Sequence, residues 1–432
     1  MIETGTAPSA AVGAKTGFRW GILSLMWSAI AINYIDRTNL AATAPVIMKE
    51  FAFSPTTMGF VFSAFSLSYT LFQIPSGWLA DRFGQRRILG AGVAWWSTAT
   101  ALIAFCRGLP SFIAARFVLG IGETAVFPSN AGVTAKWFPD KERARATTVF
   151  ALGDKFGQVF AMAPIVWLMV KYGWRVPFIV SGCIGFIWLA LWLKYYSDPE
   201  KSKYANKEEI AYIRQGQQMR DGMDRTKPPL QWYQLLRYRN VRAMCFGFFA
   251  FNYIFNFYIT WFPTYLVRAR GMHLMKMGVL AMIPPTIAML VGFASAWVQD
   301  RLYERGVSKT MVRKVSMTGG MLIGSLVGLA GFIHTDFGAV ALLTLSYSGL
   351  SCAGPTFWTL PGDVAPKNMT STVGGVMNSV AQVGGILSPI VTGYIVSTTQ
   401  SFVPALVVTA AVTLIGAANS FFYLGEVKHI EV

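Results

Sequence analysis

Apolar residues along this 432-residue chain gather in twelve long stretches. Each is close to the roughly 20 residues that a helix needs to cross a lipid bilayer. The stretches are continuous and lack the alternation of a barrel strand, so they favour membrane-spanning helices. They cover residues 18–40, 57–80, 88–106, 111–135, 147–170, 176–195, 241–266, 277–298, 315–333, 337–360, 373–396 and 402–424.

Composition and charge agree with a membrane protein. Hydrophobic residues make up 54% of the chain and charged residues only 13%. Lys and Arg concentrate in the loops on the side of both termini, which predicts cytoplasmic termini. This bias explains the net charge of +17 without a nucleic-acid partner, because the basic residues are spread over short loops. The first twenty residues lack a signal-peptide pattern, so we expect the first span to be retained.

One long polar segment, residues 197–239, divides the spans into two groups of six. We therefore predict an all-α polytopic membrane protein with two pseudo-symmetric six-helix bundles. A short amphipathic run over residues 207–218 predicts a surface helix in the linker, and a regulatory role for it stays open. The predicted units are a cytoplasmic tail (1–17), a bundle (18–196), a cytoplasmic linker (197–239), a second bundle (240–424) and a cytoplasmic tail (425–432).

The two halves carry traces of a repeat. Asp81-Arg82 follows the second stretch and Asp300-Arg301 follows the eighth, and the same offset places residues 33–35 on residues 252–254, both Asn-Tyr-Ile. Two parallel six-helix repeats follow. At this offset the uncharged Phe255-Asn256 of the second half aligns with the charged Asp36-Arg37 of the first. The two halves therefore differ most in the charge that lies inside the membrane.

Away from the ends of the predicted spans, six ionisable residues lie inside them, all in the first half. On insertion scales each costs on the order of 2.5 to 3.5 kcal/mol, so they indicate functional positions. They form three pairs along the sequence: Asp36 and Arg37, Arg116 and Glu123, and Asp154 and Lys155.

Arg116 and Glu123 lie two helical turns apart with Gly120 between them, where a glycine permits close approach of another helix. Burial favours the protonated form of a carboxyl group and a nearby arginine favours the ionised form, so the two residues together suit a proton-coupling site. We expect Glu123 to carry the proton. Asp36 is the second candidate, and it could instead be a static counter-ion of Arg37 or Arg116.

Arg37 is the candidate anchor for an anion, because a guanidinium stays charged and holds a carboxylate with two parallel hydrogen bonds. Asn33 lies one turn earlier on the same helix. Asn252 and Asn256 share a helix face in the second half, where Asn256 is a candidate contact for hydroxyl groups. For any of these amides the alternative is a hydrogen bond between helices.

The segment after the second stretch, residues 77–87 (GWLADRFGQRR), resembles the loop signature of the major facilitator superfamily, with Gln85 where a basic residue is usual. A degenerate copy ends the eighth stretch, and Arg116, Gly120 and Gly122 resemble a second superfamily motif that is associated with proton coupling. The positive charge of this loop serves the topology, and Asp81 near a helix end can also pair with arginines and helix dipoles. Such pairs predict a gate that holds one conformation closed until the halves rock apart. Its residues would be Gly77, Asp81, Arg82, Gly84, Arg86, Arg87, Asp300 and Arg301.

A narrower resemblance rests on residues 33–40 (NYIDRTNL), Gly122-Glu123 and residues 257–266 (FYITWFPTYL). These segments are similar to the anion:cation symporters, which include bacterial sugar-acid permeases. The resemblance implies proton-coupled movement of an organic carboxylate through a bacterial inner membrane by a protein that works as a monomer. It also places Tyr69, Gln73, Trp358 and Asn378 at the central cavity.

Asp154-Lys155 departs from the family pattern, because a neutral polar residue is expected in this part of the fifth span. Lys155 could contact a second carboxylate, and Asp154 could bind a hydroxyl or an amine. Alternatively, the pair compensates neighbouring charges without touching a substrate. The pair therefore weakens the prediction that the substrate is a simple monocarboxylic sugar acid.

Other classes of function are disfavoured by the sequence. It contains no Gly-Lys-Ser/Thr phosphate-binding loop, so the expected energy source is a proton gradient, with no cofactor. His273, His334 and His429 lie outside the spans, and the four cysteines lack metal-ligand spacing, so we expect neither an enzyme nor a metal site. An anion exchanger or exporter, and a non-transporting anion sensor with the same fold, remain the alternatives to a symporter.

Overall fold

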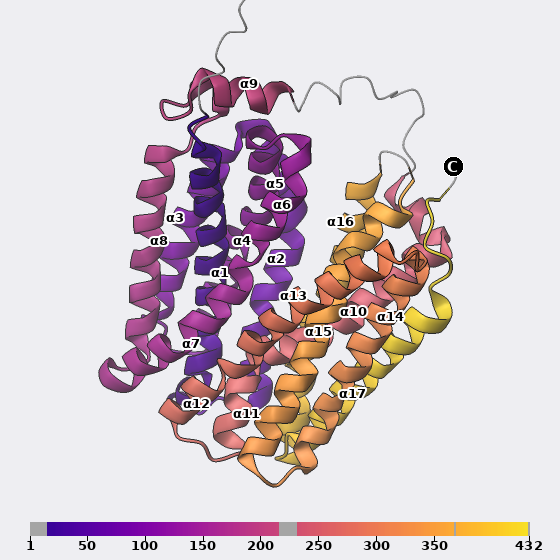
Figure 1. The fold of residues 1–432 in the computed structure, drawn as a ribbon. Coiled ribbons are helices and arrows are strands. Elements are labelled where there is room, and N and C mark those ends of the chain that lie inside the picture. The colour runs from indigo at the N-terminus through magenta and orange to yellow at the C-terminus, as the bar shows by residue number, and fades with distance from the viewer. Residues whose placement is uncertain (1–14, 216–230, 367–368, 431–432) are drawn as a thin grey trace, which may run out of the picture.

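The computed structural model of the chain describes residues 15–215, 231–366 and 369–430. Every regular element in these residues is a helix, which confirms the predicted all-helical class. The helices form two bundles side by side, the first in indigo and magenta and the second in orange and yellow (Figure 1). The N-terminal bundle contains α1 (Phe18–Glu50), α2 (Pro55–Phe83), α3 (Gln85–Ile103), α4 (Leu109–Glu123), α5 (Val126–Trp137), α6 (Asp140–Ala151), α7 (Gly153–Tyr172) and α8 (Arg175–Tyr195).

The C-terminal bundle follows the linker, whose described helices are η1 (Pro199–Lys201), α9 (Lys207–Gln215) and η3 (Trp232–Arg237). The predicted amphipathic helix is present as α9, and residues 216–218 of that prediction lie outside the described residues. The bundle contains α10 (Arg239–Thr260), α11 (Phe262–Arg268), α12 (Leu274–Leu280), α13 (Ile283–Glu304), α14 (Lys309–Gly324), η4 (Ser325–Phe332), α15 (Asp336–Val364), α16 (Thr370–Thr399), α17 (Val403–Ala418) and η5 (Asn419–Tyr423).

Ten helical segments of the described residues are long and apolar enough to cross a membrane. The two expected spans outside this set are α1 and α3. The middle of α1 carries Asn33, Asp36 and Arg37, which lower its hydropathy, and α1 runs on to Glu50 rather than ending near Leu40. A multi-pass membrane protein is therefore established by the fold, and the number twelve stays a prediction.

Two predicted spans are interrupted next to charged residues. The fourth is split into α4, which ends at Glu123, and α5, which begins at Val126. In the interruption, the Thr124 hydroxyl donates to the Ile121 carbonyl oxygen at 2.6 Å, a local bond that competes with the helical pattern. The fifth span is split into α6 and α7, and Asp154 lies in the first turn of α7. Glu123 and Asp154 therefore lie where helices end or begin, whereas Asp36 and Arg37 lie within a continuous α1.

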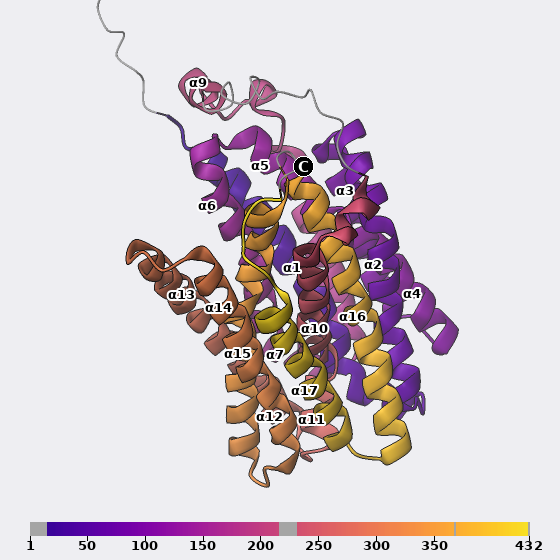
Figure 2. The same cartoon turned by 90° about the vertical axis from the view of Figure 1, so that its right-hand side faces the viewer.

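The bundles pack together at the end away from α9. Near the start of α2, the Ser63 hydroxyl donates to the Ile386 carbonyl oxygen of α16 at 2.7 Å. A Cβ atom at Gly59 would lie 2.5 Å from the Pro389 carbonyl oxygen, so a glycine is needed for this approach. Towards α9 the bundles diverge (Figures 1 and 2), and Ile74 and Trp78 of α2 are exposed.

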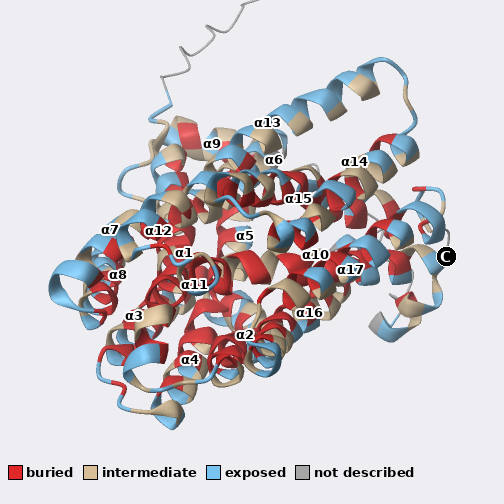
Figure 3. Cartoon of the chain, turned by 90° about the horizontal axis from the view of Figure 1, so that it is seen from below, coloured by how far each residue is buried: buried red, intermediate tan, exposed pale blue. Residues whose placement is uncertain are grey.

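Figure 3, seen from the end opposite α9, shows the residues coloured as buried mainly where helices face one another. Many large apolar side chains face outward, including Phe337 and Phe422, which are 86% and 73% exposed. An apolar outer surface of this extent suits a lipid environment rather than water.

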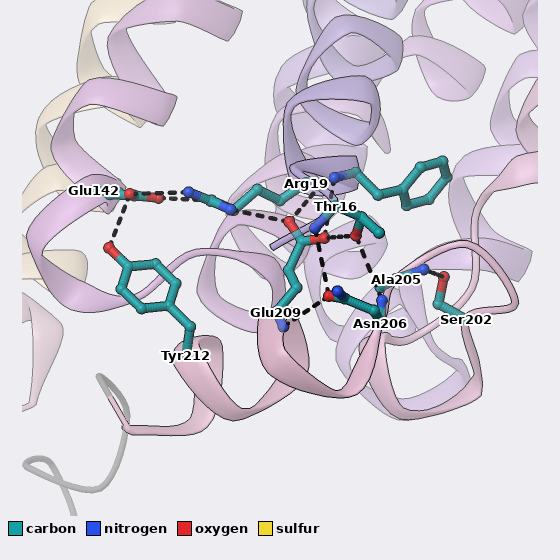
Figure 4. A network of polar contacts seen from close by, with 9 residues as sticks. Thr16, Arg19, Glu142, Ser202, Ala205, Asn206, Glu209 and Tyr212 are labelled. Carbon is teal, nitrogen blue, oxygen red and sulfur yellow. Dashed lines mark hydrogen bonds and ion pairs between the residues drawn. The ribbon is translucent and has the colours of Figure 1, made fainter. Parts of the chain in front are cut away.

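The linker is attached to the N-terminal bundle through a buried carboxylate (Figure 4). Glu209 of α9 accepts hydrogen bonds from the Phe18 and Arg19 backbone N–H groups at 3.0 and 3.2 Å, and also from the Thr16 hydroxyl. It thus satisfies backbone donors that the first turn of a helix leaves free. Burial alone would raise the pKa of Glu209, but hydrogen bonds from Thr16, Arg19 and Phe18 lower it below its ordinary value.

Arg19 extends this attachment to α6. Its Nη1 donates to Glu209 at 3.0 Å, while its Nε and Nη2 donate to the two carboxylate oxygens of Glu142 at 2.9 and 3.2 Å. The Tyr212 hydroxyl of α9 donates to Glu142 at 3.0 Å. The linker helix is therefore fixed to the starts of both α1 and α6 by charge-assisted hydrogen bonds.

Candidate functional site

A buried ion pair lies at the centre of the N-terminal bundle. The Nε of Arg37 on α1 donates to the Oε2 of Glu123 at the end of α4, at 2.9 Å. The Glu123 side chain has no exposed surface, and the Arg37 side chain is 15% exposed. A charged hydrogen bond in such a dry place is strong only while both partners are charged. Its state therefore depends on the proton occupancy of Glu123.

Aromatic rings surround the two arginines of the site. The Arg37 guanidinium lies 4.7 Å from the ring centre of Tyr34, 4.8 Å from that of Phe65 and 5.1 Å from that of Tyr69. Arg116 lies 4.6 Å from the same Phe65 ring. Aromatic faces attract cations without neutralising them, so they hold both guanidinium groups in place and leave their charge available.

Many buried polar atoms in this region lack a hydrogen-bond partner among the described residues. Such atoms are rare in proteins, and a cluster of them marks a place for water, protons or a ligand. They are both carboxylate oxygens of Asp36, both amide atoms of Asn33, Nη2 of Arg37, Nε and Nη1 of Arg116, and Oε1 of Glu123.

The partner of Glu123 differs from the sequence expectation. The spacing on α4 pointed to Arg116, yet the hydrogen bond comes from Arg37 of α1, and Arg116 acts on Glu123 only electrostatically. The two α4 residues do share a buried face, as predicted. Gly120 between them permits the expected close approach, because a Cβ atom there would lie 2.6 Å from the Phe65 carbonyl oxygen of α2.

Asp36 is 1% exposed and takes no part in the Arg37–Glu123 hydrogen bond, although it is the next residue to Arg37 on α1. The charges that act on it are those of Glu123, Arg116 and Arg37, and the Thr100 hydroxyl is its polar neighbour. The four central charged residues of the prediction therefore form one electrostatic cluster.

Of the residues placed at the cavity by resemblance, two join the halves directly. The Asn378 amide of α16 donates to the Gln73 side-chain oxygen of α2 at 3.0 Å. Tyr69 is buried one turn earlier, beside Arg37. Asn256 instead donates to Asn252 within the same helix, α10, and not to another helix as the alternative for these amides had it. Trp358 is 59% exposed and packs edge-on against Phe248, away from the charged cluster's hydrogen bonds.

Asp154 and Lys155 lie at the boundary between the halves. Lys155 Nζ is 3.4 Å from an Asp154 carboxylate oxygen and faces the rings of Phe255 on α10 and Tyr347 on α15, at 4.9 and 5.5 Å from their centres. The Tyr347 hydroxyl donates to the Gln158 side chain of α7 at 2.7 Å.

These aromatic partners were not among the predicted site residues. For Phe255 a signal existed, because the internal repeat aligns it with Asp36. Nothing in the sequence pointed to Tyr347, which lies between Ser346 and Ser348 in α15.

The predicted gate residues occupy the α9 end of the molecule. Asp81, Arg82, Arg86, Arg87, Asp300 and Arg301 are exposed, with Gly77 and Gly84 beside them. Arg82 lies 5.1 Å from the ring of Trp78, and Arg301 pairs with Glu304 at 3.5 Å. An ion pair that was not predicted joins Arg313 to Asp363 at 3.1 Å at this end of the C-terminal bundle.

The described residues contain no cluster of three or more histidine, cysteine or acidic residues that could hold a metal ion. His429 instead contacts the Ala365 carbonyl oxygen at 2.8 Å. The fold and its site thus define a polytopic transporter with buried charge in one of its two bundles.

The sequence profile of the Major Facilitator Superfamily matches residues 26–389. The chain is 35% identical to the D-galactonate transporter of Escherichia coli O6:H1 over 424 residues, which cover 96% of this chain and 98% of that protein. It is also 35% identical to the probable galactarate/D-glucarate transporter of Escherichia coli K12, over 96% of both chains. The chain belongs to the Major Facilitator Superfamily, which confirms the resemblance seen in the sequence and the assignment to transporters rather than enzymes.

Among solved structures, a bacterial homologue of the human lysosomal transporter Spinster, in an inward-facing and occupied conformation, matches with a TM-score of 0.77. The alignment covers 95% of this chain and 97% of that one at 17% sequence identity. This likeness shows the fold alone.

Proposed function

We propose that the chain is a secondary active transporter that couples proton entry to the uptake of a small organic anion of the sugar-acid class. Its two bundles alternate access to the central site, and the proton gradient is its energy source, with no cofactor. In this account, twelve spans cross a bacterial inner membrane, both termini are cytoplasmic and a monomer is sufficient. Support for the substrate class comes from the similarity to sugar-acid transporters over nearly the whole chain.

The observation that carries the coupling proposal is the Arg37–Glu123 hydrogen bond. A substrate carboxylate and the Glu123 carboxylate compete for the same guanidinium, because both are best held by its planar donor fork. When a proton neutralises Glu123, the charged interaction is lost and Arg37 becomes available to the anion. Proton and anion then occupy the site together, which is the requirement for symport.

Asp36 serves as a second proton site in this account, and Arg37 and Arg116 together balance the two acids when both acids are ionised. The unpartnered polar atoms of Asp36, Arg116 and Asn33 support this assignment. A site that carries uncompensated buried charge is costly to move through the membrane. A proton bound without the anion leaves such a charge in the site and therefore opposes the conformational change. This penalty prevents a proton from crossing alone.

The change of access is a rocking of one bundle against the other. The contacts that would have to break lie between α2 and α16 at the end away from α9, including the Ser63 hydrogen bond to Ile386. Closure at the α9 end would bring the exposed Asp81 and Arg82 towards the C-terminal bundle. Paired charges at helix ends would then stabilise that second state.

A flux assay tests the proposal. Purified protein in liposomes is given an external organic acid, such as D-galactonate, with the outside more acidic than the inside. We expect concentrative uptake that collapses when a protonophore removes the gradient. Uptake that requires an anion inside the vesicle would indicate an exchanger, and binding without flux would indicate a sensor.

A further inference from the structure

The N-terminal bundle offers a third cation, Lys155, to the central region in addition to Arg37 and Arg116. Tyr34 of α1 lies near both Arg37 and the helix of Lys155: its ring is 4.7 Å from the Arg37 guanidinium, and a Cβ atom at Gly157, two residues after Lys155 on α7, would lie 2.8 Å from the Tyr34 Cβ atom. Arg37 is held by Glu123, and Lys155 lies near Asp154 on a different helix, α7. The proposed anion site on Arg37 therefore has a cationic neighbour that the proton-coupling cluster does not use.

Lys155 is only loosely engaged. Its distance of 3.4 Å to the Asp154 oxygen exceeds the 2.7 to 2.9 Å that is typical of a charge-assisted hydrogen bond. Its other neighbours are the faces of Phe255 and Tyr347, which attract a cation but accept hydrogen bonds poorly. An ammonium group has three donors, so Lys155 has capacity for an anionic ligand.

Asp154 does not depend on Lys155 for its stability. It lies in the first turn of α7, where the positive end of the helix dipole favours a carboxylate, and it accepts a hydrogen bond from the Lys155 backbone N–H. Lys155 can therefore turn to a ligand without leaving Asp154 as an isolated buried charge.

We propose that Lys155 is the second anion-binding residue of the site and that the substrate is a dicarboxylate, with one carboxylate on Arg37 and the other on Lys155. This inference rests on the organic-anion transport proposed above and narrows its substrate class. The aromatic neighbours of Lys155 come from α10 and α15, so a diacid that reaches Lys155 also touches the C-terminal bundle. Binding of the second carboxylate thereby links the two halves.

Matched pairs of acids test the proposal. Galactarate and D-galactonate, like D-glucarate and D-gluconate, share one carbon chain and differ in whether the far end is a carboxylate or a hydroxymethyl group. Binding to the purified full-length protein is measured by calorimetry at one pH. We expect wild-type protein to bind at least one diacid about tenfold or more tightly than its monoacid, because a charge-assisted hydrogen bond contributes about that factor.

Variants at Lys155 identify the residue responsible. Lys155→Gln should reduce diacid affinity to that of the monoacid and leave monoacid affinity unchanged, while Lys155→Arg should keep most of the preference. The control is Lys171→Gln, at the exposed far end of the same helix. Unchanged monoacid binding also shows that the Lys155→Gln protein is folded.

The outcomes separate this inference from the function on which it rests. A wild-type protein that binds monoacids as well as diacids, or a diacid preference that survives in Lys155→Gln, overturns the assignment of Lys155 while organic-anion binding stands. Failure of all four acids to bind would overturn the proposed substrate class itself, and the dicarboxylate proposal with it.

Discussion

Arg37 of α1 and Glu123 of α4 are joined by a hydrogen bond of 2.9 Å in which the carboxylate side chain has no exposed surface. The two residues lie in different helices, and each also has a polar atom without a partner among the described residues. The two side chains are therefore tightly coupled, but each has hydrogen-bonding capacity that is not used. Such an arrangement can change partners when a proton or an anion arrives.

Replacement of Arg37 should remove the anion site. Arg37→Ala leaves the Glu123 carboxylate buried without its partner and takes away the donor fork, so we expect a loss of at least about 100-fold in affinity for an organic acid. Calorimetric titration of the purified variant measures this loss. Arg175→Ala, which alters an ion pair with Glu50 on the outer surface, is the control and should bind normally.

If Arg37→Ala retained wild-type affinity, the anchor would have to be Arg116 or Lys155. The charge-conserving Arg37→Lys should recover part of the affinity, because an ammonium keeps the charge but loses the planar geometry.

Gly120 should tolerate no side chain. A Cβ atom at this position would lie 2.1 Å from the Ser68 hydroxyl and 2.6 Å from the Phe65 backbone oxygen, so α2 and α4 would have to separate. We expect Gly120→Ala to destabilise the protein by about 1–3 kcal/mol, visible as a lower melting temperature in detergent.

The matched control is Gly319→Ala, since a Cβ atom at Gly319 in α14 would meet nothing within 4 Å. That variant should melt at or slightly above the wild-type temperature. Equal melting temperatures for Gly120→Ala and wild type would contradict the packing described for α2 and α4.

The attachment of the linker should depend on pH. Hydrogen bonds lower the pKa of Glu209 in the folded protein, so its contribution is present above the ordinary carboxyl pKa and is lost as the pH falls through the lowered value. We therefore expect amide hydrogen exchange in α9 to accelerate on acidification, after correction for the intrinsic exchange rate.

Glu209→Gln should show faster exchange in α9 already at neutral pH, because an amide cannot replace the ion pair with Arg19. Glu208→Gln alters the neighbouring residue, which takes no part in the network of Figure 4, and should leave the exchange unchanged. Slow exchange in α9 of Glu209→Gln would show that Glu209 does not hold the linker in place.

The sequence predicted the placement of the helices well, because long apolar runs between polar segments have few alternatives in a membrane. It also indicated that Gly120 allows close packing and that the charges belong to one bundle. It did not predict the helix interruption after Glu123. At that interruption the Thr124 hydroxyl is hydrogen-bonded to the Ile121 carbonyl oxygen, within an otherwise continuous apolar stretch.

The partners of the charged residues could not be read from the sequence. Spacing along α4 relates Arg116 to Glu123 but says nothing about α1, so the hydrogen bond from Arg37 required the tertiary structure. The contacts of Lys155 with Phe255 and Tyr347 likewise join helices from opposite halves. Such pairs depend on how the bundles are packed against each other.

The role of Glu123 as the proton carrier is the central claim, and gradient-driven uptake by Glu123→Gln in liposomes tests it most directly. The amide keeps the shape of the acid but cannot exchange a proton, so we predict loss of concentrative uptake with anion binding retained. Asp36→Asn tests the second proton site in the same assay, and Glu200→Gln, which alters an exposed ion pair with Arg214 in the linker, is the control. Undiminished gradient-driven uptake by the Glu123→Gln protein would contradict the account.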